Sequence, residues 1–222
     1  MSEALDYTLS ARMFAYALFN RIFAEEPTES LLEMLICEQT WESMSFMEEE
    51  DFFPHLREQA DWLRDIGAES ALADLIKDFT RLFLGPGKLP APPWESVYLS
   101  GQDILYQVST LRVRNAYREQ GYMSVGYPRV ADDHIAIETD FMRRLAERSI
   151  VSLAEGDRST CLELLSSQKR FLNTHMLVWV SLFAERIRLQ VKTCTFYPCI
   201  AESLSSYIVF DDRLLDEISV IV

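Results

Sequence analysis

One short run of the sequence holds residue types that commonly perform acid–base or metal chemistry. Asp133, His134 and Glu138 follow a loop, and the residues after them have the apolar spacing of a helix. On a helix His134 and Glu138 share a face because they are four positions apart, and Asp133 lies beside that face. A carboxylate next to a histidine is typical of a general base with its orienting acid, or of two metal ligands. One hypothesis is therefore a small metal-dependent hydrolase.

The same run also has a purely structural interpretation. Asp132 is well placed to cap the N-terminus of the helix, and His134 can hydrogen-bond to the loop. The chain has only 3 His, and no other lies near this run in the sequence. Both interpretations are open from the residues alone.

A second candidate is the one compositional break in the chain, residues 85–93. This stretch contains Gly85, Gly87 and four prolines, including Pro92 and Pro93 at its end. Consecutive prolines lack backbone donors and hold φ near −65°, so we expect the stretch to be extended and stiff.

Large aromatic residues follow the stiff stretch directly. Trp94 and Tyr98 flank Glu95 closely in the sequence. Rigid aromatic contact area beside an acid suits the recognition of a peptide that is both apolar and cationic. It is equally open that Trp94 only seals the core where two groups of helices meet.

A further stripe consists of His175, Trp179 and Phe183, which are spaced at i, i+4 and i+8. Stripes of this kind usually face the core, and we expect the same here.

No cofactor or metal is expected. Gly85 to Lys88 lack the spacing of a phosphate-binding loop and follow a helix instead of a strand. Cys194 and Cys199 have four residues between them, which differs from the usual zinc spacing.

Apolar residues recur at helical spacing along nearly the whole chain, and no useful strand-like alternation is present. We expect an all-α protein, a single globular helical domain of about nine or ten helices over residues 1–222. An N-terminal helical part, 1–121, is followed by a hinge loop, 122–131, and a C-terminal helical part, 132–222. The hinge makes exchange of helical halves between two copies plausible. The expected helices cover residues 5–23, 31–35, 48–65, 72–83, 104–121, 132–145, 161–171, 175–191, 196–209 and 214–221.

Composition excludes several classes of protein. The 222 residues are 49% hydrophobic, with 13 Phe, 9 Tyr and 4 Trp, which excludes a mainly disordered chain. The formal net charge of −14 argues against a nucleic-acid partner. Residues 1–100 hold 19 acidic and 7 basic side chains, including the run Glu48 to Asp51. This excess is either a solvated surface or a field that attracts a cationic partner.

The sequence also bears on where the protein is expected to work. The N-terminal residues are acidic where a secretory signal would be basic and then apolar. The most apolar stretch, 176–184, is far shorter than a bilayer span. We therefore expect a cytoplasmic protein that does not span a membrane, with reduced thiols.

Three stretches together resemble a known family. They are FTRLFLGPGKLPAPPWESVY at 79–98, Asp133-His134 followed by Phe141-Met142, and the Phe171, His175, Trp179 and Phe183 stripe. The chain resembles the TorD/DmsD/NarJ family of redox-enzyme maturation chaperones, and most of all its TorD/DmsD branch.

The resemblance implies an all-helical cytoplasmic chaperone dedicated to a molybdoenzyme. Such a protein binds the twin-arginine leader and the apo form of a molybdopterin oxidoreductase, and delays export until the cofactor is inserted and assembly is complete. It is not an enzyme and has no cofactor of its own. Members occur as monomers and as homodimers.

The resemblance also implies a leader-binding site. The contacts would come from Trp94, Glu95, Ser96, Tyr98, Asp133 and His134, supported by Asp132, Glu138, Pro92 and Pro93. We expect Trp94→Ala or Asp133→Ala to weaken leader binding without unfolding the chain. One departure is that Val130-Ala131 stands where many members have Glu-Pro.

Overall fold

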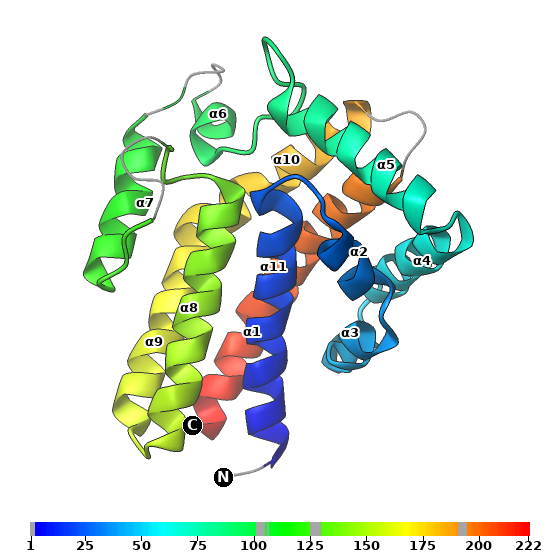
Figure 1. Cartoon of the computed structure of the whole chain (residues 1–222). Coiled ribbons are helices and arrows are strands. Elements are labelled where there is room, and N and C mark those ends of the chain that lie inside the picture. The colour runs from blue at the N-terminus through cyan, green and yellow to red at the C-terminus, as the bar shows by residue number, and fades with distance from the viewer. Residues whose placement is uncertain (1–2, 101–104, 106, 125–129, 191–194) are drawn as a thin grey trace.

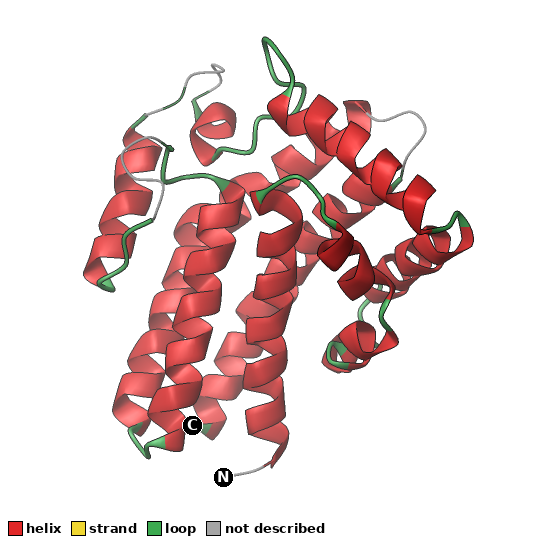
Figure 2. Cartoon of the chain, viewed as in Figure 1, coloured by secondary structure: helices red, strands yellow, loops and turns green. Residues whose placement is uncertain are grey.

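The structure is a computed structural model that describes residues 3–100, 105, 107–124, 130–190 and 195–222. Within these ranges all regular secondary structure is helical, as Figure 2 shows, and the expected all-α fold class is confirmed. No helix in the described ranges is long and apolar enough to cross a membrane.

A bundle of long helices forms the centre of the molecule: α1 (Glu3–Ala24), α8 (Ile135–Ala154), α9 (Arg158–Phe171) and α11 (Phe196–Ile221). These helices lie side by side in Figure 1, with both chain ends near the same end of the bundle. Their inward faces carry large buried side chains such as Tyr16, Phe19, Phe141 and Tyr207. Helix α10 (Leu177–Gln190) packs on α11.

Shorter helices from the N-terminal part pack beside this bundle. They are α2 (Glu29–Ile36), α3 (Glu38–Glu42), the 3₁₀ turn η1 (Ser45–Met47), α4 (Phe52–Asp65) and α5 (Ala68–Phe79). Thr28 caps α2 through its hydroxyl, which accepts a hydrogen bond from the amide of Leu31 at 3.3 Å. Helix α5 continues into a π-helical turn, η2 (Thr80–Leu84), and helical structure stops at Gly85.

The Pro-rich stretch leads from η2 to two further helices, α6 (Glu95–Leu99) and α7 (Val108–Glu119). As expected, residues 85–93 contain no helix. A second π-helical turn, η3 (Leu172–Met176), joins α9 to α10 and contains His175. Both π-helical turns, η2 and η3, lie close to the candidate site described below. In proteins, π-helical turns are often found at functional sites.

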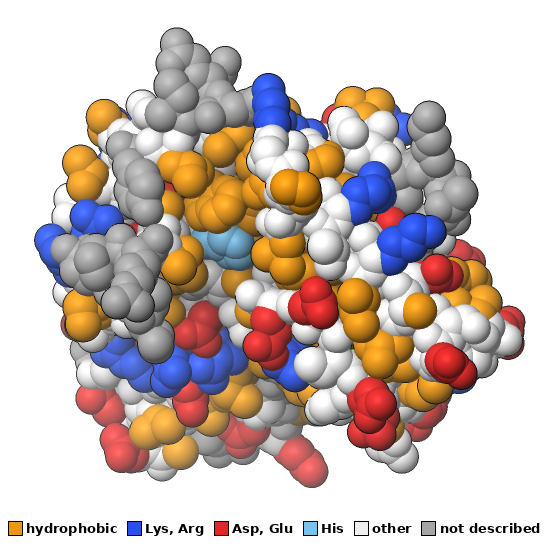
Figure 3. All heavy atoms as spheres, turned by 45° about the horizontal axis from the view of Figure 1, so that its top comes forward, with side chains coloured by type: hydrophobic (Ala, Val, Ile, Leu, Met, Phe, Trp, Pro, Cys, Tyr) orange, Lys and Arg blue, Asp and Glu red, His pale blue; other side chains and the backbone are white. Residues whose placement is uncertain are grey.

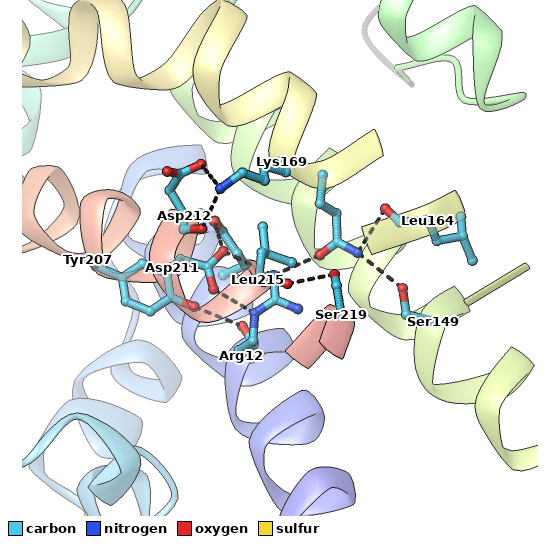
Figure 4. A network of polar contacts seen from close by, with 11 residues as sticks. Arg12, Ser149, Leu164, Lys169, Tyr207, Asp211, Asp212, Leu215 and Ser219 are labelled. Atoms are coloured by element: carbon cyan, nitrogen blue, oxygen red, sulfur yellow. Dashed lines mark hydrogen bonds and ion pairs between the residues drawn. The ribbon is translucent and has the colours of Figure 1, made fainter. Parts of the chain in front are cut away.

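A buried polar network ties three of the long helices together (Figure 4). Arg12 of α1 is completely buried and donates to both carboxylate oxygens of Asp211 on α11, at 2.5 and 3.0 Å. Its guanidinium also donates to Gln168 of α9 at 2.9 Å, and Tyr16 donates to Asp211 at 2.7 Å. The nearby carboxylate raises the pKa of Arg12 against the opposing effect of burial. The network fixes how α1, α9 and α11 align.

The structure corrects some helix boundaries. The helices expected at 196–209 and 214–221 are one continuous helix, α11. Glu48 to Asp51 precede α4, which begins at Phe52. Residues 125–129 of the expected hinge loop lie outside the described residues, as do Ile104 and Cys194.

Candidate functional site

The Trp-containing segment and the Asp-His motif meet at a short antiparallel bridge. The amide of Glu95 donates to the carbonyl of Asp133, and the amide of Ile135 donates to the carbonyl of Pro93, both at 2.9 Å. The bridge pairs Trp94 with His134, and their rings pack edge to face with centroids 5.1 Å apart. Two motifs about 40 residues apart in the sequence therefore form one local structure.

Asp133 holds the start of α6 in place. Its Oδ2 accepts a hydrogen bond from the backbone amide of Ser96 at 2.8 Å, and both residues are completely buried. A carboxylate on the free amides of a helix N-terminus satisfies donors that the helix itself cannot. The side chains of Asp133 and Ser96 do not line the surface pocket described below.

The helix cap at α8 differs from the expected one. The N-cap is His134, whose Nδ1 accepts from the amide of Ala136 at 3.1 Å, and not Asp132. Nδ1 therefore carries no proton, and the neutral ring holds its proton on Nε2. Partial burial beside Trp94 lowers the pKa of His134 to about 4, which keeps the ring neutral near pH 7.

Asp132 instead ties α7 to the start of α8. Its carboxylate accepts from Arg114 Nε at 2.6 Å and from the hydroxyl of Ser124 at 3.0 Å. Its carbonyl accepts from the hydroxyl of Tyr117 at 3.0 Å. Asp132 thus has a supporting position behind the bridge.

The other two carboxylates of the motifs lie beneath the bridge. Glu95 is 1% exposed and its Oε2 lies 3.0 Å from Nδ1 of His175, while Glu138 accepts from the indole of Trp179 at 3.0 Å. Burial, and next the charge of Glu95, raises the pKa of Glu138 well above its usual value. His175 and Trp179 thus belong to the core, as expected for their stripe, and they anchor both carboxylates from η3 and α10.

Tyr98 and the prolines complete the support. The Tyr98 ring is half-buried against Trp179 and Phe183, at centroid distances of 5.5 and 6.1 Å. Pro92 and Pro93 are buried. Of the site residues predicted from the sequence, Trp94 and His134 line the surface pocket, and the others do not.

That pocket opens between α1, η2 and the start of α8. It has a volume of about 750 Å³, and most of its lining is apolar. Figure 3 shows hydrophobic side chains gathered around a histidine on this face, with acidic side chains next to them. Apolar and aromatic lining comes from Phe23, Ala24, Phe79, Phe83, Leu84, Trp94, Tyr122, Val130, Ala136 and Ile137.

Three acidic residues that line the pocket were not predicted from the sequence. Glu25 and Glu26 directly follow α1, and Asp140 lies one turn beyond Ala136 on α8. Glu25 pairs with Arg21, whereas Glu26 accepts a hydrogen bond from the Thr80 hydroxyl at 3.3 Å. The only sequence signal for the first two was the Glu-Glu pair before Pro27 at a helix end, which indicates no particular function.

The arrangement does not support the hydrolase hypothesis. Asp133, His134 and Glu138 point to three different partners: the amide of Ser96, the amide of Ala136 and the indole of Trp179. Groups of three or more side chains able to hold a metal are absent from the described part of the chain.

Fold and site together define a class: an all-α protein with an open, apolar, acid-rimmed pocket next to a Trp–His bridge. Comparison with known proteins then gives the family. The model of the family described as "nitrate reductase delta subunit" matches residues 48–185, and the chain belongs to this family. The resemblance seen in the sequence is thus confirmed.

Named relatives in this group are chaperones. The chaperone protein TorD of Vibrio cholerae serotype O1 is 31% identical over 165 residues, which cover 74% of this chain and 71% of that protein. TorD of a Psychrobacter species is 26% identical, over 95% and 94% of the two chains. The Tat proofreading chaperone DmsD of Salmonella typhimurium is 32% identical, over 57% and 60%.

A solved structure shares the fold. It is described as a redox enzyme maturation protein from Archaeoglobus fulgidus, and it superposes with a TM-score of 0.53 over 89% of this chain and 93% of the other. At 17% sequence identity, this likeness supports the fold alone.

Proposed function

We propose that this chain is a client-specific chaperone that binds the twin-arginine leader and the apo form of a molybdopterin oxidoreductase, and delays export until cofactor insertion and assembly are complete. The observation that carries the proposal is the open apolar pocket with Trp94 and His134 on its wall and three acids among its lining residues. Membership of a family whose named relatives include a Tat proofreading chaperone supports it.

The chemistry of the pocket matches that of a twin-arginine leader. Such a leader combines two guanidinium groups with an apolar segment, and guanidinium binds carboxylates and stacks on aromatic faces. In our proposal the apolar segment lies over Phe83, Leu84 and Ile137, while Trp94 offers an aromatic face. Glu26 provides negative charge at the same pocket, whereas the charge of Asp140 is offset because Arg143 and Arg144 pair with its carboxylate.

The buried members of the predicted site then act as positioning residues. Asp133 and Ser96 hold the start of α6, and Glu95 links that segment to His175. Their part in the proposal is to keep Trp94 and His134 at the pocket wall. This revises the expectation that Glu95 and Asp133 themselves contact leader arginines.

Other parts of the proposal follow from the family. The chaperone makes and breaks no covalent bond, works in the cytoplasm and needs no cofactor of its own. It is a single domain over residues 1–222 that acts as a monomer or a homodimer. The client is a molybdoenzyme that carries a twin-arginine leader.

Isothermal titration calorimetry with a synthetic twin-arginine leader tests the proposal. Wild-type protein should bind the leader, and replacement of both leader arginines by glutamine should abolish measurable binding. Trp94→Ala should weaken binding about tenfold or more, since buried Trp residues often carry at least 2 kcal/mol at an interface.

The matched control is Trp62→Ala, because Trp62 is also partly buried but lies on α4 and does not line the pocket. It should leave the affinity unchanged. Equal binding of the arginine and glutamine peptides by the wild type would refute a leader-binding function.

A further inference from the structure

A second groove lies on the surface between α2 and α5. It has a volume of about 530 Å³ and shares no lining residue with the pocket at Trp94 and His134. Its lining residues are Glu29, Leu32, Glu33, Ile36, Ala68, Glu69, Leu72, Ala73 and Ile76.

The floor of the groove consists of two apolar rows. Leu32 and Ile36 are four positions apart on α2, and Leu72 and Ile76 are four positions apart on α5, so each pair shares one helix face. Leu32 is buried, whereas the other three are half-buried. Two packed helices that each present such a row form a groove of the kind that takes up a third, amphipathic helix.

The rims of the groove are acidic. Glu29 and Glu33 on α2 and Glu69 on α5 are exposed, and no ion pair joins them to a described Lys or Arg. Glu38, just beyond α2, differs because it pairs with Arg57 and Arg64. Lys77 follows the groove residue Ile76 but does not line the groove. The rims therefore favour a partner with basic residues beside its apolar face.

We propose that the α2–α5 groove docks a basic amphipathic helix of another protein, with apolar side chains at i and i+4 in the floor and Lys or Arg side chains against the three glutamates. A second copy of this chain fits poorly, because residues 1–100 hold 19 acidic and 7 basic side chains and the whole chain has a net charge of −14. This site goes beyond the proposed leader-binding function, which uses a different pocket.

The probe is an 18-residue peptide of Leu and Lys with the Leu residues spaced to one helix face. A peptide of the same composition with Leu spread around the helix is the control. In NMR titrations of the isotope-labelled full chain, the amphipathic peptide should shift amide signals of α2 and α5, and the control peptide should not. Shifts confined to residues around Trp94 and His134 would overturn the proposal.

Charge reversal gives a matched pair of variants. Glu33→Lys/Glu69→Lys should weaken binding of the amphipathic peptide about tenfold or more. Glu48→Lys/Glu49→Lys changes the net charge equally but lies outside the groove, and it should have a much smaller effect. Equal effects of both variants would mean that net charge alone attracts the peptide, and would overturn the site.

Ala73→Arg is a second blocking variant that does not touch the core, because Ala73 is exposed on α5 and helices tolerate Arg well. It should abolish the α2 and α5 shifts while leaving leader affinity unchanged. A change of sedimentation from dimer to monomer in this variant would instead identify a second copy as the occupant and would refute a foreign helix.

Discussion

At the scale of single residues, the candidate site has two layers. Trp94 and His134 face the pocket, and Glu95, Asp133 and Glu138 lie beneath them with partners of their own. The layers separate residues that can touch a ligand from residues that hold others in position. Substitutions in the lower layer should therefore act first on stability.

Asp133→Ala should lower the free energy of unfolding by about 1–3 kcal/mol, because it leaves the buried amide of Ser96 without an acceptor. Asp133→Asn should lose less, since its amide oxygen can still accept that hydrogen bond. Urea denaturation followed by circular dichroism measures both. A wild-type midpoint for the alanine variant would show that the hydrogen bond contributes little.

His134 should make stability dependent on pH. Its pKa is about 4 in the folded chain and about 6.5 when unfolded. As the pH falls from about 6.5 to about 4, the unfolded state takes up a proton that the folded state does not, so His134 contributes a loss of stability. Above about pH 6.5 both states are neutral and the contribution vanishes.

The His134→Asn variant isolates this effect, because Asn is a good N-cap and does not titrate. As the pH falls from about 6.5 to about 4, the free energy of unfolding of the wild type should decrease relative to that of the variant. Denaturant titrations at several pH values measure it. A constant difference over this range would show that His134 titrates normally.

At the scale of helices, alignment depends on the buried network around Arg12 and Asp211. Asp211→Ala should destabilise the chain by about 3–5 kcal/mol, because it leaves the Arg12 charge buried without its partner. Replacing both residues, as in Arg12→Met/Asp211→Leu, should recover much of that loss, since apolar residues of similar volume often replace a buried ion pair well. Chemical denaturation compares the three proteins. A double variant as unstable as Asp211→Ala would contradict this reasoning.

The long helices were predictable from the sequence because apolar spacing is a local property. The first helix ends before Pro27, as expected, and the structure also contains the helix predicted after the Asp-His motif. The 3₁₀ and π turns and the continuity of α11 were not found, because tertiary packing decides where a helix changes its winding or continues.

The candidate site was only partly predictable. The sequence indicated Trp94 and His134, and the structure brings them into one bridge. It did not indicate which carboxylates lie buried, because Glu95 and Asp133 find their partners only in the folded chain. Asp140 and Glu26 were missed because no motif marks them. The roles of all these residues in leader binding stay predictions.

At the scale of the whole molecule, the net charge of −14 gives the protein a negative field, and most of the excess lies in residues 1–100. Such a field should speed the encounter with a basic leader. The association rate constant from stopped-flow fluorescence should fall as salt rises from 0.01 to 1 M, since the screening length shrinks from about 30 to about 3 Å. The dissociation rate should change less. An association rate that does not depend on salt would exclude steering.

The central claim, that a twin-arginine leader binds at the pocket beside Trp94 and His134, is tested most directly by photo-crosslinking. A leader peptide with a benzophenone in its apolar segment is irradiated with the full chain, and the modified residues are identified by mass spectrometry. The proposal predicts crosslinks at pocket residues such as Leu84, Trp94 and Ile137. Crosslinks found instead in the α2–α5 groove, at residues such as Ile36 and Ala73, would contradict it.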